Sequence, residues 1–595
     1  MADSPALNSS GVIKCTIFSE GNSLNQNYRL ISIVIEKRIN KIARAELVFS
    51  DGDMPNKKFP LSDAEEVSPG KKITIKVGYG NSEDQIFEGI VIRHGLHIDE
   101  STSILKIHCF DEALAMTVGR KNANFIDLKN SDIISQILNQ YNQITNEVTE
   151  STTKFAELVQ YNASDWDFMV ARAESSGLLV AVEDGKVSVF NPKTQGDALL
   201  TVTYGEDLIE FEADINAQQL YKEVKSIGWN LDNLATQEEA ISSLALNKQG
   251  NLTESTLAEI LKLDSYRLQT TVPLEQSALK EWATGQQQKS SLSKICGRMT
   301  FQGSAKAKLA GVIEIKGVGK RFSGNVFISG VRHEVVNGNW ITEVQFGLDA
   351  KFYTDENNVH SSKAAGLTPG VEGLMTGIVE QLDEDPQGQN RIKVVVPVLQ
   401  AETQGVWARL VQYYGSSGFG NFFIPEIGDE VVLGYFNNDP SNPVVLGSLY
   451  SSKHTPPYDL TADNFIKALV TRSGHKVEFD DDKKIITIVT PSENSIVLSD
   501  DDKSITLADQ NSNTVTLNTS GIALDSPKDI SIKAKGTINI DAVGKISVSS
   551  KADIAQSGLN ISNTANVGFT AKGNATAELS ASGQTTVKGA IVMIN

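Results

Sequence analysis

The sequence has few of the residues that mark disulfide-rich, secreted or membrane-spanning proteins. Its 595 residues include only three cysteines, Cys15, Cys109 and Cys296, which lie far apart and form no CxxC pair. That number and spacing argue against a disulfide framework and against a zinc ribbon. No apolar run approaches the ~18 residues that a membrane-spanning helix needs. Residues 1–11 are polar and lack the apolar region of a signal peptide. We therefore expect synthesis in the cytoplasm without a Sec signal.

Basic residues are also in the minority. The chain has 54 lysines and arginines against 73 aspartates and glutamates, which gives a formal net charge of −19. A field of that sign repels a phosphate backbone, so we expect no nucleic-acid partner. The length allows roughly three to five domains with cores of their own.

Motifs that carry chemistry are missing as well. The sequence contains neither HExxH nor GxSxG. Gly317–Lys320 resembles part of a phosphate loop, but Arg321 stands where that motif needs serine or threonine. His94 and His97 fall in a predicted strand, and their spacing sends them to opposite faces, away from a shared metal. Gly415–Gly420 lies between predicted strands and is expected to be a flexible loop. We expect no enzyme activity, no metal and no cofactor.

What is present is mainly strand-like patterning with some helix. Alternating or continuous apolar residues predict strands at 12–18, 29–36, 45–49, 72–79, 85–96, 103–109, 178–182, 186–190, 311–315, 324–334 and 339–348. Helices are predicted from Ser131, from Ser164 to a stop at Gly177, and over 236–263 and 275–296.

A composition change separates this region from a small β unit. Residues 353–372 are rich in Asp, Asn, Ser, Gly and Pro, which predicts a linker. Short predicted strands follow at 373–382, 391–396, 407–411, 420–424, 429–436 and 443–449. Several such strands with Gly and Pro turns in ~80 residues predict a small closed barrel, such as an oligonucleotide/oligosaccharide-binding (OB) fold.

The C-terminal region repeats an apolar–polar–apolar triplet roughly every eight residues, from near Ile466 to the last residue. The clearest apolar positions, which we predict to form a core, are Ile505, Leu507, Val515, Leu517, Ile522, Leu524, Ile530, Ile532, Ile538, Ile540, Ile546 and Val548. Each triplet places two side chains on one face of a strand. One such strand cannot bury a core alone, so the repeat predicts a rigid rod made by several chains winding together.

Two acidic clusters lie within this repeat, at Asp480–Asp482 and Asp500–Asp502. Clustered carboxylates suit calcium, whereas Asp-rich segments before a strand also form solvated hairpin turns. The sequence favours the turn because the fuller ligand pattern of a calcium loop is missing, and leaves ion binding open.

Two long segments of the barrel carry a family resemblance. They are Phe423–Val431, with Pro425, Gly428, Asp429 and Glu430, and Phe436–Ser448, with Asp439, Pro440, Pro443 and Gly447. Both are similar to the OB-fold motif of VgrG spikes and of contractile-phage tail spikes. Gln160–Met169 and Gly330–Glu334 resemble segments of the hub region in the same family.

The resemblance implies an architecture. It assigns 1–352 to a baseplate hub of two tail-tube-like domains with helical insertions, 353–372 to a linker and 373–455 to the OB barrel. Residues 456–595 become an intertwined triple-stranded β-helix, in which each chain contributes every third strand of a face. A homotrimer of two-domain hubs offers six tube-like domains to a sixfold inner tube.

The same resemblance implies a function and partners. The trimer caps the inner tube, nucleates the baseplate and punctures the target envelope, meeting the membrane only transiently as part of an exported or released injection particle. The segment 451–465 is too short for an enzyme domain. The last strand, Ile591, Val592, Met593, Ile594 and Asn595, is expected to bind a PAAR-type tip protein, and effector cargo is a further expected partner.

Two other interpretations fit parts of the sequence. One is a β-solenoid adhesin or carbohydrate-binding surface protein that uses the barrel and the rod. The other is a solenoid lyase, which the eight-residue units disfavour because such coils need roughly 20 residues a turn. The sequence leaves open whether the machine is a type VI system, an extracellular injection particle or a phage-like tail.

Overall fold

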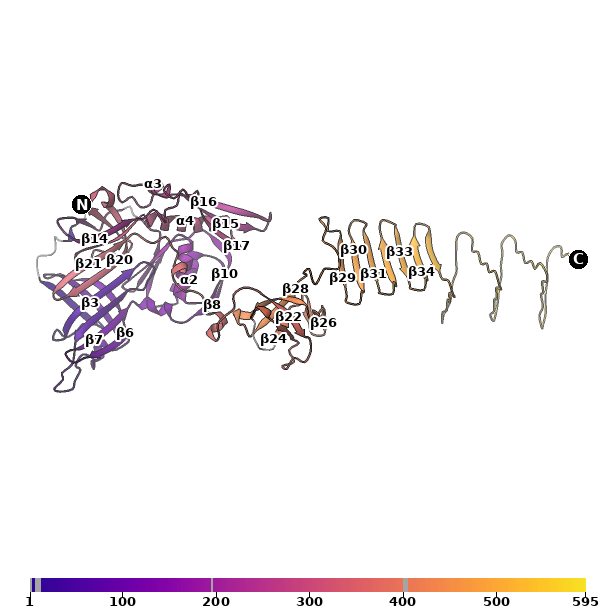
Figure 1. Ribbon diagram of the computed structural model, residues 1–595, viewed down its shortest axis with the longest axis horizontal. Coiled ribbons are helices and arrows are strands. Elements are labelled where there is room, and N and C mark those ends of the chain that lie inside the picture. The colour runs from indigo at the N-terminus through magenta and orange to yellow at the C-terminus, as the bar shows by residue number, and fades with distance from the viewer. Residues whose placement is uncertain (1–2, 6–11, 194–195, 400–404, 595) are drawn as a thin grey trace. The chain divides into compact units, whose positions relative to one another are not determined.

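The computed structural model describes residues 3–5, 12–193, 196–399 and 405–594. The chain divides into two compact units, Met1–Leu449 and Tyr450–Asn595. The first is built mainly from strands, with few helices, and the second has strands only between Ile466 and Asp525 among its described residues (Figure 1). Among the residues described, no helix combines the length and apolar character needed to span a bilayer.

A 13-stranded sheet dominates the first unit, in the order β14-β18-β21-β20-β3-β4-β7-β6-β5-β1-β2, with β19 and β13 branching from β20. Its strands are β1 (Ile13–Ser19), β2 (Asn22–Ser23), β3 (Arg29–Arg38), β4 (Arg44–Ser50), β5 (Lys72–Tyr79), β6 (Asp84–Ile98), β7 (Ser103–Phe110), β13 (Leu200–Thr203), β14 (Leu208–Ile215), β18 (Ile295–Gln302), β19 (Val312–Lys316), β20 (Gly324–Val336) and β21 (Asn339–Phe346). The strands predicted for this region are confirmed to within about two residues, the usual uncertainty of element boundaries.

This sheet serves two separate apolar cores. One is formed by the N-terminal strands around Ile33, Phe87 and Ile107. The other is formed by β18–β21 around Phe301 and Phe346. The two halves are joined where β3 pairs with β20, which are about 300 residues apart in the chain. The division of the hub into two domains, and their likeness to tube subunits, stay predictions.

A helical layer forms a third core. Its elements are β8 (Lys121–Lys129), α1 (Asn130–Leu138), β9 (Thr145–Val148), β10 (Lys154–Ala163), α2 (Asp165–Ser175), β11 (Leu179–Glu183) and β12 (Lys186–Phe190). Both predicted helices are confirmed. Ser164 accepts a hydrogen bond from the Asp167 N–H at the start of α2, and Gly177 follows its end with φ +72°. Trp166 and Met169 are buried between the helices.

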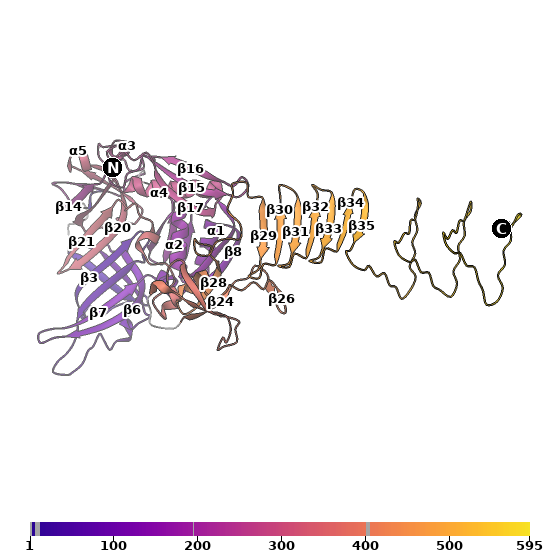
Figure 2. The ribbon, with the colours of Figure 1, turned by 45° about the vertical axis from the view of Figure 1, so that its right-hand side comes forward.

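The prediction of one helix over 236–263 is wrong. The structure has β15 (Glu223–Asn230), β16 (Ala235–Ser242), the short α3 (Glu254–Ala258), β17 (Tyr266–Pro273) and α4 (Gln276–Leu292). The β16 sequence, ATQEEAIS, favours a helix by propensity, but it pairs along its whole length with β15. That sheet packs against α4, the predicted helix of 275–296 (Figure 2).

The remaining short elements connect these parts. They are the 3₁₀ turns Glu65–Val67, Glu112–Thr117, Lys363–Gly366, Pro397–Leu399 and Phe436–Asn438, with the short helices α5 (Gly319–Phe322) and α6 (Tyr353–Glu356). Tyr353 packs against the third core, so the start of the predicted linker is attached to the hub.

The predicted barrel is present and closed. Its path is β22 (Met375–Gln381), β23 (Ile392–Val395), β24 (Val406–Leu410), β28 (Pro443–Ser448) and β27 (Glu430–Tyr435), around Val394, Val431 and Leu433. The predicted strand 420–424 is wrong. A short hairpin of β25 (Gly415–Ser416) and β26 (Phe419–Gly420) lies there instead, with Gly420, at φ +141°, paired to Gly415.

The second unit opens with a seven-stranded antiparallel meander (Figure 1). Its strands are β29 (Ile466–Val470), β30 (Lys476–Asp480), β31 (Ile485–Val489), β32 (Ser495–Ser499), β33 (Ser504–Ala508), β34 (Thr514–Asn518) and β35 (Gly521–Asp525). Each strand pairs with the next one in the chain. The expectation that each chain supplies only every third strand is therefore wrong for Ile466–Asp525.

The ladder within one chain ends at Asp525. Residues 526–594 contain no strand, although the sequence predicted triplets at 530–532, 538–540 and 546–548. Spacing between triplets does not separate the two regions. Strands β30–β34 start nine or ten residues apart, and β35 starts only seven residues after β34 yet pairs with it. The later triplets start eight residues apart and do not pair within one chain.

Candidate interaction surfaces

The resemblance motif of the barrel lies in its turns and at strand ends. Asp429 accepts a hydrogen bond from the Glu426 N–H at 2.9 Å, and Gly428 holds φ +94° and donates to the Val379 carbonyl. Asp439 accepts from the Ser441 N–H at 2.8 Å, which lowers the pKa of its carboxyl. These contacts fix loop geometry.

The other motif residues occupy the barrel wall or its loops. Glu430 opens β27, Pro443 opens β28, and Gly447 pairs opposite Val432 beside a bulge. Pro425 and Pro440 stand in the loops that lead into those strands. The structure therefore brings the motif together around β27 and β28, where it serves the fold.

One face of the meander is apolar. Cross-strand pairing aligns two continuous columns of side chains, interrupted only by Lys467; we call these residues the apolar face: Leu469, Val477, Phe479, Ile486, Ile488, Ile496, Leu498, Ile505, Leu507, Val515, Leu517, Ile522 and Leu524. Most of them are about two-fifths exposed or more; Ile496, for example, is 39 % exposed. The opposite face carries mostly Ser, Thr, Lys and acidic residues. A one-sided sheet of this kind needs a cover.

The predicted core residues are split by this arrangement. The six from Ile505 to Leu524 lie together on the apolar face. The six beyond Asp525, which are Ile530, Ile532, Ile538, Ile540, Ile546 and Val548, are at least half exposed in one chain. The predicted tip residues Ile591, Val592, Met593 and Ile594 are exposed too, and Asn595 lies outside the described residues.

The acidic clusters of the second unit form hairpin turns. Asp480 accepts hydrogen bonds from the Asp482 and Lys483 N–H groups at 3.1 Å each. Asp502 accepts from the Ser499 hydroxyl at 2.9 Å. Within the described ranges, no three His, Cys, Asp or Glu side chains gather as a metal site would require. The clusters therefore have the geometry of solvated turns.

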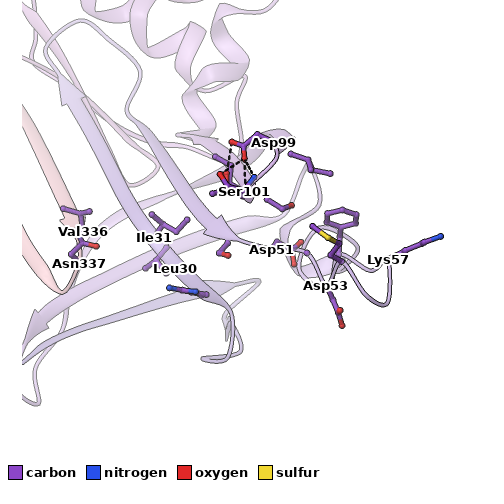
Figure 3. A pocket seen from close by; sticks show the side chains of 18 of the residues that line it. Leu30, Ile31, Asp51, Asp53, Lys57, Asp99, Ser101, Val336 and Asn337 are labelled. Carbon is purple, nitrogen blue, oxygen red and sulfur yellow. Dashed lines mark hydrogen bonds between the residues drawn. The ribbon is translucent and has the colours of Figure 1, made fainter.

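The hub contains an open pocket of about 910 Å³ at the ends of β3, β4, β7 and β20 (Figure 3). Its apolar lining is Leu30, Ile31, Met54, Phe59, Ile98, Ile104, Val335 and Val336. Figure 3 shows Leu30 and Ile31 on one strand, Val336 and Asn337 on another, and Lys57 pointing away from the other labelled residues.

Two carboxylates that line this pocket accept hydrogen bonds from N–H groups of nearby loops. Asp51 accepts from the Leu61 and Ser62 N–H groups, and Asp99 accepts from Ser101 and Thr102 (Figure 3). The backbone hydrogen bonds to Asp99 lower its pKa to about 2. The pocket can hold an apolar group, but these two carboxylates have loop-capping roles and are not paired for acid–base work.

Cysteine and histidine side chains also have structural roles. Burial raises the pKa of Cys15 and Cys109 to about 12 and that of Cys296 to about 11, so these thiols are poor nucleophiles. His94 bonds to the Ser62 hydroxyl at 2.9 Å, on one side of its strand.

One exposed feature of the barrel was not predicted from the sequence. Gly415–Gly420, predicted to be a flexible loop, forms the tip of a hairpin whose flanks carry exposed aromatic rings. We call residues 411–425 the aromatic hairpin. In the sequence, this feature could have been recognised from an uncharged stretch that contains five Phe and Tyr residues.

Two domain families match the chain. The family described as the Alg8 N-terminal domain matches residues 9–337, which is more than half of the chain. The family described as the type VI secretion system/phage-baseplate injector OB domain matches residues 375–450, the span of the closed barrel.

Curated relatives are similar over shorter segments. The type VI secretion system spike protein VgrG3 of Vibrio cholerae is 30 % identical over 119 residues, which are 18 % of this chain and 11 % of the relative. The spike protein VgrG1a of Pseudomonas aeruginosa is 27 % identical over 141 residues, which are 21 % of this chain and 22 % of the relative. The chain spans less than a quarter of either relative's length.

Solved structures resemble the chain at low identity. A tail protein of prophage MuSo2 from Shewanella oneidensis aligns with a TM-score of 0.43 and 11 % identity, over 57 % of this chain and 99 % of that one. A type VI secretion component from E. coli aligns with a TM-score of 0.36 and 10 % identity, over 73 % and 99 %. Likeness this low identifies neither a ligand nor a partner. From the two domain families and the curated relatives, the chain belongs to the VgrG and phage tail-spike family, with an Alg8-type N-terminal domain ahead of an injector OB domain.

Proposed function

We propose that the chain is the subunit of a homotrimeric, non-enzymatic spike of a contractile injection system. In this proposal the trimer caps the inner tube, nucleates the baseplate and punctures the target envelope. Family membership supports the kind of machine. The main observation in favour of a trimer is the apolar face of the meander, which a single chain leaves exposed to water.

The apolar face gives a physical reason for assembly. Covering each half-exposed aliphatic side chain contributes on the order of 1 kcal/mol, so a whole face supplies a large driving force. Three amphipathic sheets can close into a triangular prism with their apolar columns inside and their polar faces in water. In this proposal residues 466–525 form such a prism, with one sheet from each chain.

The segment beyond Asp525 supports a different mode of winding. Its triplets are spaced eight residues apart, and within one chain it forms no ladder among the described residues 526–594. Backbone N–H and C=O groups of an extended chain need partners once they are buried. Strands from two other chains provide them, so we assign the intertwined β-helix to this segment.

The partners follow from the same proposal. The two hub cores correspond to two tube-like domains, so three chains match a sixfold inner tube. Baseplate proteins bind around the hub, a PAAR-type protein binds the exposed residues Ile591–Ile594, and effector cargo travels with the spike. The chain is made in the cytoplasm and leaves with the fired particle. The hub, linker, barrel and needle limits at 352, 372 and 455 belong to the proposal.

The test is the position of the chain in an assembled particle. Particles purified from cells that express an epitope-tagged chain are imaged by cryo-electron microscopy. We expect threefold density at one end of the inner tube, in an amount of three chains per particle. Particles that assemble normally without the chain, or that carry it along the whole tube, would contradict the proposal.

A carbohydrate-binding surface protein is the alternative function. One observation favours it, which is that the rings of Tyr413 and Phe422 are each 86 % exposed on the barrel. Sugar-binding sites stack sugar faces on aromatic rings and add convergent polar groups. Binding of the full chain to peptidoglycan fragments or polysaccharides tests this function directly.

A further inference from the structure

The aromatic hairpin has an unusual exposed surface. Residues 411–425 carry five aromatic rings, all more than half exposed: Tyr413, Tyr414, Phe419, Phe422 and Phe423. Scattered exposed apolar side chains are ordinary in proteins, whereas five rings on one short segment form a patch of the kind that marks an interface.

The hairpin is a built structure with both ends fixed to the barrel. Leu410 and Ile424, on either side of the rings, pack against the barrel core. The Val411 N–H donates to the Val445 carbonyl at 3.0 Å, and the Asn421 N–H donates to the Tyr414 carbonyl at 2.7 Å. The hairpin therefore presents its rings without a large loss of conformational entropy on binding.

A glycine keeps the two arms of the hairpin close. A Cβ atom at Gly420 would lie 2.7 Å from the Tyr414 carbonyl oxygen and 2.8 Å from the Gly415 Cα. The rings of Tyr414 and Phe419 consequently meet across the hairpin, with centroids 5.9 Å apart. The close approach of the two arms and the contact between the rings together fix the conformation of the hairpin.

The charge of the hairpin fits a second copy of the same chain. Residues 411–425 contain no Asp, Glu, Lys, Arg or His, in a chain whose formal net charge is −19. Identical acidic chains repel one another, so they associate through surfaces that carry no charge. A neutral aromatic surface can contact its own copy without the repulsion that the charged surfaces of this chain cause.

The area is of the right size as well. Aromatic side chains bury about 150–250 Å² each, so five rings that are more than half exposed offer on the order of 600 Å² per copy. A stable interface buries about 800 Å² per partner. The hairpin therefore supplies most of such a contact, and the neighbouring barrel surface supplies the remainder.

The polar side chains of the hairpin argue against a sugar as its occupant. The Asn421 amide donates to the Gln412 side-chain oxygen, and the Gln412 amide donates to the Phe423 carbonyl at 3.1 Å. These amides bond to the hairpin itself, although sugar hydroxyls need such groups as partners. Ring-to-ring packing between copies has no such requirement.

We propose that the aromatic hairpin is a self-association contact through which the OB barrel of one chain binds the barrel of another. This inference rests on the proposed trimer and deepens it, because it locates a contact between copies outside the needle. The barrels then hold three chains together next to the point where the needle begins in the sequence.

The first experiment measures dissociation of the full-length trimer on dilution by mass photometry. The variant is Tyr413→Ser with Phe422→Ser, and the control is Tyr161→Ser with Tyr204→Ser, two hub tyrosines that are each 69 % exposed. We expect the variant to dissociate at a concentration at least ~10-fold higher, as for aromatic hot spots. The control should match the unmodified chain, and circular dichroism should show the same fold in all three.

A second experiment works even if the needle holds the trimer too tightly to dilute. Cys109 is buried, Cys15 and Cys296 are partly buried, and desolvation raises the pKa of all three thiols, so a new surface cysteine is the reactive one. Phe422→Cys, treated with a diamide oxidant that is reduced as two thiols form a disulfide, should give cross-linked pairs of full-length chains. Tyr161→Cys should give none.

The outcomes separate the two levels of the proposal. This inference alone is overturned if the unmodified chain is a trimer, the hairpin variant dissociates at the same concentration, and Phe422→Cys gives no cross-linked pairs. A wild-type monomer overturns the trimer and this inference with it. Loss of polysaccharide binding in the hairpin variant, with an unchanged trimer, would replace the second copy with a sugar.

Discussion

At the scale of single residues, the hub depends on buried polar groups that have several partners each. Glu174 is 2 % exposed and accepts hydrogen bonds from Asn40 at 2.7 Å, from Lys289 at 2.6 Å and from the Tyr353 N–H. It therefore joins a turn of the large sheet, helix α4 and the segment that leaves the hub. Burial raises the pKa of its carboxyl, and Lys289 opposes that rise.

Removing this carboxylate should destabilise the hub strongly. Glu174→Ala leaves the Lys289 ammonium buried and unpaired, which costs about 3–5 kcal/mol in the free energy of unfolding. Urea unfolding followed by circular dichroism measures the loss. The matched control is Glu150→Ala, whose ion pair with Lys129 lies in solvent and should contribute far less to stability. Equal losses in the two variants would contradict the role of Glu174.

A buried histidine should make the hub sensitive to acid. His333 bonds to the Thr342 hydroxyl at 2.9 Å, and burial, with Lys37 nearby, lowers its pKa to about 3. Between pH 3 and 6.5 the unfolded chain therefore binds one more proton than the folded chain. Stability is full above about pH 6.5 and falls by about 1.4 kcal/mol per pH unit as the pH drops.

The measurement is unfolding free energy against pH for the unmodified chain and for His333→Gln. The variant lacks the titrating group, so its slope between pH 6.5 and 4 should be shallower by about one proton. His97→Gln changes an exposed histidine in the same way and controls for the substitution itself. A parallel loss of slope in both variants would show that other groups govern the acid response.

At the scale of elements, helices α2 and α4 pack at backbone distance through glycine. A Cβ atom at Gly285 of α4 would lie 2.6 Å from the Glu174 carbonyl oxygen and 3.2 Å from Gly177. The contact therefore has no room for a methyl group, and the two helices must separate to accept one.

Gly285→Ala should consequently lower hub stability by about 1–3 kcal/mol through overpacking, although alanine is the better helix former. Lys280→Ala changes an exposed position of the same helix and should have little effect. Thermal unfolding of both variants compares the two results. A stabilised Gly285→Ala protein would mean that the helices are not in close contact.

The two faces of the meander allow a matched pair of substitutions. Ile496 and Val497 are adjacent in β32 and point to opposite faces, Ile496 to the apolar one. Ile496→Lys places a charge inside the proposed prism and should shift the trimer toward monomers by at least ~100-fold, because burying an unpaired ammonium costs several kcal/mol. Val497→Lys places it on the polar face and should leave assembly unchanged. Sedimentation velocity distinguishes them, and equal behaviour would exclude the apolar face as the contact.

Sequence patterns predicted the elements whose conformation is set mainly by one local feature, such as apolar alternation or a helix cap. Strands such as Lys72–Tyr79 and the helix capped by Ser164 follow from alternation and capping, so they were found from sequence. β16 was missed because pairing with β15 overrides helical propensity. The aromatic hairpin was missed because its shape depends on Gly420 and on anchors in the barrel core, which no local pattern reveals.

At the scale of the whole molecule, the sequence already indicated that the chain needs partners to complete its core. Triplets with two apolar residues predicted a core that one chain cannot complete, and the six from Ile505 to Leu524 do lie on one open face. The change from self-pairing strands to unpaired triplets at Asp525 was not predicted. Triplet spacing does not reveal it, because β35 starts seven residues after β34 and pairs with it, whereas the later triplets start eight residues apart and do not pair within one chain.

We expect three copies of this chain to assemble through apolar surfaces that one copy leaves exposed. The most direct test is the mass of the purified full-length protein in solution, measured by sedimentation equilibrium and native mass spectrometry. We expect a single species of three times 64.4 kDa that persists at micromolar concentration. A monodisperse, folded monomer of 64.4 kDa under the same conditions would contradict it.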